Sequence, residues 1–427
     1  MDAAVPTDQH RHFLAGFAPF DRNQSGVQQT LRLFGERHPV LIANPGVSFS
    51  VVSGILKLPV VKKLLSRRSF LSGGACVIAA PFVNTGRFRL FAGALETYSS
   101  TTVDLVREST VIDMLGLLTL DYKRLAAWRS NPTSFGEADF QRLKDSGITV
   151  FHPAVGYTGG DIYAASSADI AAWDAFVAAH PDYFLRVDCP SDVPRVKVEG
   201  KLGIIVGQQN SNHFRTVNDV DAFYERGQRV SQLTYYDNLL GGGSNDPGEK
   251  GLTAYGEQVL ARMNELGMAV DVSHCGDRTT LDTIEASSKP VLVTHSNCRA
   301  LVPHSARCKT DTAIRKLAAR GGVLGVTLVR LFVGTGAQVT IENVLNHVDH
   351  VAKVAGVEHV GLGTDVDLVG RDSAIAPKKR NDLDDVHYAQ KIFQLTEGLV
   401  RRKYAKADIR LILGGNFQRA LGEIWTG

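Results

Sequence analysis

Two histidines follow successive apolar runs of the chain in the same way. Ser273-His274 comes after "MAVDV", and Thr294-His295 comes after "PVLV" about one βα unit later. Neutral imidazole is a common nitrogen ligand of transition metals. If the runs are neighbouring parallel strands, both imidazoles reach the same metal ion. A single histidine is most often a hydrogen-bonded structural residue, but a matched pair at strand ends favours a metal site.

A carboxylate and a guanidinium have comparable positions. Asp365 follows a further apolar run in "GLGTDVD", where it would bind the metal or accept a proton from a metal-activated water. Arg307, in "SARCKTD" after the second histidine, would form a bidentate pair with a substrate carboxylate, such as the C-terminus of a short peptide. Its alternative role is to cap the next helix. Tyr235 and Asn210 are the other candidate substrate-binding residues.

The elements that position these residues form a repeating pattern. From about residue 110, short β-branched or aliphatic runs alternate with longer amphipathic stretches, which is typical of βα units. The pattern predicts eight strands and hence a (β/α)8 TIM-type barrel, whose chemistry lies at the C-terminal ends of the strands. A doubly wound sheet is disfavoured because no glycine-rich loop follows the first run. The predicted strands are 110–118, 147–155, 202–209, 229–236, 268–274, 290–295, 321–328 and 359–365.

Helix signals flank the histidine-bearing runs. Thr253 is a predicted N-cap, and Gly267 is a predicted stop just before the first histidine run. Thr310 or Asp311 caps the next predicted helix, which ends near Gly321. Each helix therefore ends where the following strand begins.

Composition narrows the class of protein. The chain has 427 residues, 44% of them hydrophobic, and carries 47 basic against 44 acidic residues. This near balance gives no electrostatic reason to expect nucleic acid as a partner. The five cysteines lack CxxC spacing, so neither a disulfide framework nor a thiolate zinc site is indicated.

The N-terminal part resembles a targeting segment. In 62–83, a basic cluster with Arg67 and Arg68 precedes a short apolar stretch, which is the order of a twin-arginine signal. We therefore expect a leader or mis-called start over 1–60, a signal region over 61–94, and one barrel domain over 95–427. Export to the periplasm follows, with membrane contact only through an uncleaved signal. The alternative is that the arginine pair is an ordinary solvated turn.

Several segments together resemble the zinc-dependent membrane (renal) dipeptidase family of metallopeptidases, in the amidohydrolase superfamily. The resemblance runs from about Val111 to Leu421 and is densest over 251–311. It implies a dipeptide or related amide substrate, two zinc ions bridged by a glutamate and a water, and a homodimer. His274 and His295 match two family zinc ligands, Asp365 matches the aspartate that handles the proton of the attacking water, and Arg307 matches the arginine that binds the substrate carboxylate, if one residue is inserted. The segments include "MAVDVSHCGDRTTLDTIEASSKPVLVTHSN", "ARCKTD", "LAARGGVLGV", "VGLGTDVD" and "LGGNFQRAL".

Other family positions differ. Leu115 and Leu117 stand where the family has His-x-Asp, and aliphatic side chains cannot bind a metal. Gln208 replaces the bridging glutamate, and a neutral amide does not offset the repulsion between two dications. Tyr235 stands where the family has the fourth-strand histidine. These differences argue against two metal ions.

The sequence instead favours a site for a single zinc ion. His274, His295, a water, and Asp365 or Gln208 would give it four ligands. Asp113, just before the lost pair, is a further possible ligand, with a structural role as the alternative.

We therefore expect an exported zinc-dependent hydrolase of dipeptides or related small amides, working at a mononuclear site. One alternative is a catalytically inactive protein of the same fold that binds a peptide or another small carboxylate. The other is a mononuclear esterase or lactonase, which the apolar first strand would suit.

Overall fold

The computed structural model describes residues 86–91, 96–119, 121–153, 156, 159–368 and 382–425. All of them belong to the second of two units of the chain, Leu71–Gly427. The predicted leader over 1–60, the arginine pair and most of the signal region lie outside the described residues. Within the described ranges, no helix combines the length and apolar character that crossing a membrane requires.

A closed parallel barrel forms the centre of the structure. Strand β3 pairs with β5 on one side and with β13 on the other, and the ring continues through β12, β11, β10 and β9. The remaining strand has two parts: β7 pairs with β5, and β8 pairs with β9, which closes the ring. The barrel strands are β3 (Ile112–Asp113), β5 (Val150–Phe151), β7 (Leu202–Ile204) with β8 (Gly207–Gln208), β9 (Val230–Gln232), β10 (Ala269–Asp271), β11 (Leu292–Ser296), β12 (Val323–Val326) and β13 (Val360–Leu362).

The (β/α)8 prediction is confirmed, since each of the predicted runs overlaps one of these strands, and only β11 extends past its run, by one residue at Ser296. The strands are shorter than the runs. The sequence analysis also missed β6 (Phe184–Arg186), which pairs in parallel with β7. Two further pairings lie outside the ring: β1 (Arg87–Phe88) with β2 (Tyr98–Ser99), and β4 (Gly116–Leu117) with β14 (Val366–Asp367).

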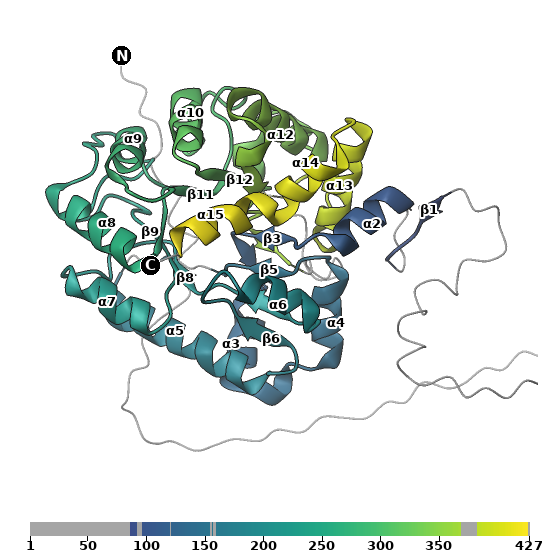
Figure 1. Cartoon of the computed structure of the whole chain (residues 1–427), viewed down its shortest axis with the longest axis horizontal. Coiled ribbons are helices and arrows are strands. Elements are labelled where there is room, and N and C mark those ends of the chain that lie inside the picture. The colour runs from purple at the N-terminus through teal and green to yellow at the C-terminus, as the bar shows by residue number, and fades with distance from the viewer. Residues whose placement is uncertain are drawn as a thin grey trace, which may run out of the picture. The chain divides into compact units, whose positions relative to one another are not determined.

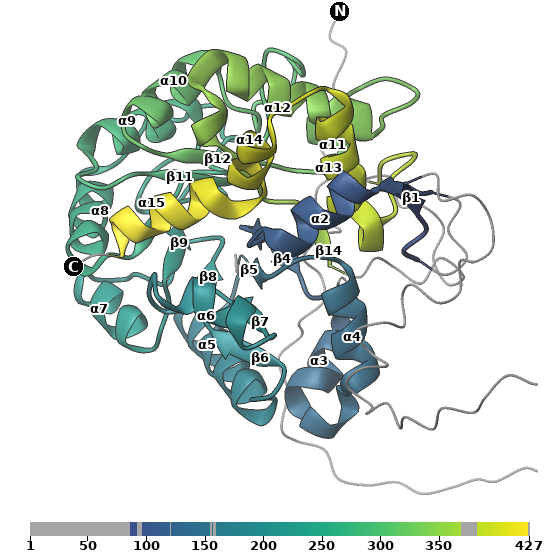
Figure 2. The same cartoon turned by 45° about the vertical axis from the view of Figure 1, so that its right-hand side comes forward.

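Helices surround the barrel. In Figures 1 and 2, α5, α7, α8, α9, α10 and α12 follow one another around the outside of the strands. The helices are α2 (Ser100–Glu108), α3 (Tyr122–Ser130), α4 (Glu137–Asp145), α5 (Ile162–Ala179), α6 (Asp192–Val198), α7 (Asn218–Glu225), α8 (Ala254–Leu266), α9 (Asp277–Ala286), α10 (Asp311–Ala319), α11 (Arg330–Val333), α12 (Ile341–Ala355), α13 (Lys391–Arg401), α14 (Lys406–Arg410) and α15 (Asn416–Ile424), with short helical turns η1 (Pro132–Ser134), η2 (Val357–His359), η3 (Tyr388–Gln390) and η4 (Leu411–Gly415).

The predicted caps hold the helices before and after the histidine-bearing strands. The Thr253 hydroxyl accepts from the Gly256 N–H, 2.9 Å away, at the start of α8. Gly267 ends this helix with φ 77°, a left-handed conformation that glycine adopts without strain. Of the two residues predicted to cap α10, Thr310 is the N-cap, and its hydroxyl oxygen accepts from the Ala313 N–H. These caps fix where β10 begins and where the loop after β11 ends.

Helix α15 covers the N-terminal ends of the strands. Gly267, which precedes β10, lies against Ile424 at the end of α15 and against Trp425, which follows it. Gly321, which precedes β12, lies against Glu423 of α15. Within the barrel, a Cβ at Gly361 would lie 2.2 Å from the Phe417 ring, so α15 can approach only because residue 361 has no side chain. Figure 2 shows α15 crossing the barrel strands. One end of the barrel is thus filled with apolar side chains, and polar chemistry is left to the other.

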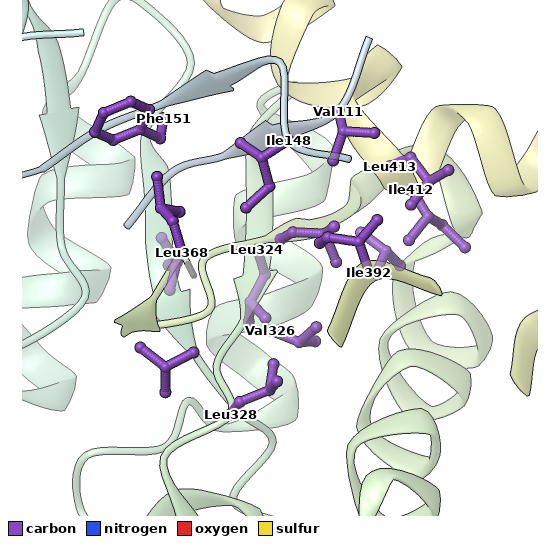
Figure 3. Packing of buried hydrophobic residues seen from close by; sticks show 14 of the residues in the cluster. Val111, Ile148, Phe151, Leu324, Val326, Leu328, Leu368, Ile392, Ile412 and Leu413 are labelled. Atoms are coloured by element: carbon purple, nitrogen blue, oxygen red, sulfur yellow. The ribbon is translucent and has the colours of Figure 1, made fainter. Parts of the chain in front are cut away.

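A second apolar cluster joins the strands to the surrounding helices. Figure 3 shows Phe151 of β5 and Leu324 of β12 together with Ile392 of α13 and Leu413 of η4. All four side chains are 1% exposed or less. Burial of this kind stabilises the fold by about 25 cal/mol per Å² of apolar surface removed from water.

Buried His347 on α12 should make the fold acid-sensitive. Its Nδ1 accepts from the Cys298 N–H at 3.1 Å, and its Nε2 contacts the Val333 carbonyl at 3.1 Å. Burial lowers the pKa of His347 to about 4. A histidine in the unfolded chain has a pKa near 6.5. Below that pH the unfolded chain is protonated at this residue while the folded chain is still neutral, so the free energy of unfolding falls as the pH falls.

We predict that His347→Gln, which retains a donor and an acceptor, loses less stability than the wild type between pH 7.5 and pH 5. The expected difference is about 2 kcal/mol in the free energy of unfolding, measured by urea denaturation. Above pH 7.5 the two proteins should show the same pH dependence. If the free energy of unfolding fell equally with pH in the two proteins between pH 7.5 and pH 5, His347 would not be the source of the acid sensitivity.

Candidate metal and active site

The Asp271 carboxyl group joins the two histidine-bearing segments. Its Oδ1 accepts from the backbone N–H of Ser273 and of Thr294, both at 2.9 Å. The hydroxyl of Ser273 donates to Oδ1 at 2.6 Å, and the hydroxyl of Thr294 donates to Oδ2 at 2.7 Å. The Ser273 hydroxyl also accepts from the His295 N–H at 3.0 Å. Because all these groups are buried, the network fixes the backbone on which both histidines stand.

The same network sets the tautomer of His295. Its Nδ1 lies 2.8 Å from the Thr294 hydroxyl oxygen. That hydroxyl already uses its only hydrogen for Asp271, so it must accept here, and Nδ1 must carry the proton. The Nε2 atom of His295 is therefore left with a free lone pair. A metal-binding histidine usually has this arrangement, with the other ring N–H donated to a protein oxygen.

His274 faces that lone pair. It lies three residues after the end of β10, beyond the strand end where the sequence analysis placed it, whereas His295 lies within β11. The two Nε2 atoms are 3.1 Å apart. Tyr235 stacks on the His274 ring, with centroids 4.0 Å apart and planes inclined by 22°. Tyr235 therefore orients one imidazole of the pair.

Both imidazoles are held in the neutral form. Burial lowers the pKa of His274 and of His295 well below the usual value for histidine, and the positive charge of Arg307 lowers both further. Two neutral nitrogens at this distance need either a proton or a cation between them. The pair therefore has the protonation state that a metal requires of its ligands.

The donor set fits one metal ion better than two. Two imidazole nitrogens bound to the same tetrahedral zinc lie about 3.3 Å apart, given Zn–N bonds of about 2.0 to 2.1 Å, and the observed separation is close to this. Leu115 and Leu117 offer no donor atom for a second ion. Across the described residues, no three His, Cys, Asp or Glu side chains are already gathered as a metal site. Only the histidine pair is preformed.

Arg307 contacts both histidine-bearing segments, and its charge acts on Asp365. Asp365 has φ 57°, and its N–H donates to the Leu115 carbonyl at 2.7 Å. Burial raises the pKa of Asp365 to about 7, and the charge of Arg307 opposes that rise. Arg307 is 3% exposed. It donates to the backbone carbonyls of Ser273 and His295, and its Nε has no partner among the described residues. The guanidinium thus braces the histidine segments and keeps one donor unused.

Three other candidate residues have partners outside the histidine pair. Gln208 donates to Asp169 of α5 at 3.1 Å, so its amide nitrogen faces the helix layer. Asp113 accepts from the N–H and hydroxyl of Thr364 at 2.7 and 2.5 Å, which ties β3 to the segment after β13. The Asn210 side-chain oxygen accepts from Asn238 at 3.1 Å. These contacts favour structural roles for Asp113 and Asn210.

The sequence analysis missed His152, which follows β5 directly. It is 1% exposed, and its Nδ1 lies 2.9 Å from the Met114 carbonyl. Its Nε2 has no hydrogen-bond partner in the part of the chain that the structure describes. Burial lowers the pKa of His152 to about 4. The signal was available, since "GITVFH" ends on a histidine much as the two later runs do.

The sequence is similar to those of two curated proteins named as dipeptidases. The chain is 32% identical over 246 residues to an uncharacterised dipeptidase of Schizosaccharomyces pombe, covering 55% of this chain and 56% of that protein. It is 29% identical over 238 residues to the dipeptidase tcpJ of Claviceps purpurea, covering 55% and 53%. The chain thus spans about half the length of these curated relatives.

Solved structures share the fold over a longer range. An amidohydrolase from Pseudomonas aeruginosa superposes with a TM-score of 0.65 at 25% identity, over 76% of this chain and 99% of that one. A metallopeptidase from Rhodobacter sphaeroides, liganded with a phosphinate mimic of the dipeptide L-Ala-D-Ala, gives a TM-score of 0.59 at 20% identity, over 74% and 99%. The latter shows likeness of fold alone.

A family model covers almost the whole barrel. The match extends over residues 100–426, and the model describes membrane dipeptidases, peptidase family M19. This range includes every candidate site residue named above. The chain therefore belongs to the membrane dipeptidase family.

Proposed function

We propose that this protein is a hydrolase that cleaves dipeptides or related small amides at a site holding one zinc ion. The observation that carries the proposal is the convergence of the His274 and His295 Nε2 atoms, 3.1 Å apart on a rigid, buried network. Family membership supports the dipeptide class, as does the solved relative described with a dipeptide mimic. The absence of donors at Leu115 and Leu117 is the reason for proposing a single ion.

Each residue of the proposed site has a separate task. A zinc ion held by the two histidines would polarise the scissile carbonyl and lower the pKa of an attacking water. Asp365 accepts the proton released by that water and passes it to the departing amine. Arg307 presents its Nε–H, which has no partner among the described residues, to the carboxylate of the substrate and so sets the position of the scissile bond.

A second candidate function is binding without catalysis. Two observations favour it: the first strand has aliphatic side chains at both family ligand positions, and Gln208 donates to Asp169 on α5. Such a protein would keep Arg307 for a carboxylate ligand and bind no metal. An esterase or lactonase at the same single-metal site is a third candidate, which differs from the first only in the bond that is cleaved.

We also propose export through a twin-arginine signal, on the basis of Arg67 and Arg68 before an apolar stretch. A pathway that transports folded proteins would allow the metal to be inserted before export. The relevant surroundings would then be the periplasm.

Metal content tests the proposed function first. We predict about one zinc per chain in the full-length protein purified without chelator, measured by elemental analysis. His274→Ala should lose the metal, because the preformed pair of imidazole nitrogens is then broken. Hydrolysis of a dipeptide panel should disappear with the metal and return when zinc is added to the wild type. A metal-free wild type that binds peptides would support the binding protein instead.

Asp365→Asn tests proton transfer separately from metal binding. Asparagine also adopts positive φ readily, so the backbone at 365 should be retained. We predict that kcat falls by about 10²- to 10⁴-fold, which is the usual contribution of a general base. Zinc content should be unchanged. A variant with near wild-type kcat would show that Asp365 does not handle the proton.

The export proposal is tested by replacing Arg67 and Arg68 with lysine, which keeps the charge but removes the arginine pair. We predict that the doubly substituted chain stays in the cytoplasm of the producing bacterium, as followed by cell fractionation. Replacing Lys62 and Lys63 with arginine is the matched control and should leave export intact. Unchanged export of the Arg67 and Arg68 variant would contradict the proposal.

A further inference from the structure

His152 has the features of a metal ligand whose partner is missing. Its Nδ1 lies at hydrogen-bond distance from the Met114 carbonyl, which can only accept, so Nδ1 carries the proton. Its Nε2 therefore presents a lone pair. That atom is buried and has no partner among the described residues. A buried polar atom left without a partner costs about 1 to 3 kcal/mol, so the arrangement needs a reason.

The barrel makes room for this imidazole at one position. A Cβ added at Gly207 would lie 2.3 Å from the His152 Nε2 atom. Gly207 belongs to β8, on the strand next to β5. Any larger residue there would push the ring out of place. The position of the His152 ring therefore requires a glycine at residue 207.

His152 lies on the side of the site where the family ligands are missing. Its carbonyl accepts from the Gly116 N–H at 3.3 Å, so it is in contact with the segment that bears Leu115 and Leu117. It is also coupled electrostatically to the pair and its network, since a positive charge on His152 would lower the pKa of His295, and the charge of Asp271 raises the pKa of His152. A nitrogen donor from β5 would thus approach the pair from the direction of the first strand.

We propose that His152 supplies the third nitrogen ligand to the metal ion held by His274 and His295. The inference rests on the proposed function, because it needs a metal at the histidine pair. The three side chains are not gathered in this structure, so they must draw closer together when the ion binds. Three histidines and one open position form a known catalytic zinc arrangement, in which a water completes the tetrahedron. The lost His-x-Asp donors are then replaced by one donor from the neighbouring strand.

Metal titration of the full chain tests this ligand directly. The metal-free protein is titrated with Co²⁺, followed by visible absorption, and with Zn²⁺ in competition with a chelating dye. His152→Leu fills a similar space without a donor, and we expect it to bind both ions at least about tenfold more weakly. His347→Gln is the matched control, because His347 is also buried but has partners at both nitrogens. It should bind as the wild type does.

A cysteine at the same position gives a positive signature. If residue 152 contacts the metal, His152→Cys with Co²⁺ should show a thiolate-to-cobalt charge-transfer band that the wild type lacks. Gly207→Ala should weaken binding while His152 is retained. Circular dichroism and thermal melting of each metal-free variant identify any protein that has failed to fold, and the conclusion then rests on the variants that fold.

The outcomes separate the two proposals. A wild type that binds no Co²⁺ or Zn²⁺ would overturn both the metal site and the role of His152. A wild type that binds through His274, together with unchanged affinity in His152→Leu and no band in His152→Cys, would overturn the role of His152 alone. In that case the Nε2 atom holds a water or another neutral partner.

Discussion

The hydrogen bonds of Asp271 are the interaction on which the site depends. This single buried carboxyl group accepts from both the backbone and the hydroxyl groups of Ser273 and Thr294. It therefore sets the conformation after β10 and joins it to β11. Through the Thr294 hydroxyl it also decides which nitrogen of His295 carries the proton. Without this carboxyl group the hydroxyl could donate to His295, and the lone pair that faces His274 would no longer be fixed.

The barrel around this network is shaped by residues that have no side chain. A Cβ at Gly325 of β12 would lie 2.1 Å from the Thr294 carbonyl oxygen, and one at Gly363, just after β13, would lie 1.8 Å from it. Close approach of these backbones to β11 is possible only with glycine at both positions. At the other end, α15 packs against the strands over Gly361. The packing thus separates an apolar end of the barrel from a polar end. At the polar end, buried polar groups find hydrogen-bond partners, which offsets the free energy cost of burying them.

The sequence was sufficient for the parts of the site that depend on neighbouring strands. His274 and His295 could be paired because parallel strands joined by one helix usually lie side by side, and the caps at Thr253 and Thr310 follow local rules. His152 could not be assigned in this way. The position and the tautomer of its ring depend on two residues that are distant or not recognisable in the sequence. Gly207, more than 50 residues later, leaves space for the ring, and the Met114 carbonyl contacts its Nδ1. The direction of the Gln208 amide likewise depends on Asp169 of α5, whose carboxylate is held by Arg129 at 2.8 Å. Strand β6 has only three residues, too few to show a period.

Charge balance supports the proposed single-metal site. If Leu117 and Gln208 stand where other family members have carboxylates, the two substitutions take away two negative charges. A site with one divalent ion in place of two also loses two positive charges. The net charge of the buried region is then unchanged, and the aliphatic Leu115, which is fully buried, occupies space that no longer needs a donor. If only the carboxylates had been lost, two dications would repel each other without compensation. If only one ion had been lost, uncompensated carboxylates would remain in the barrel. The combined substitutions are therefore consistent with conversion to a single-metal site.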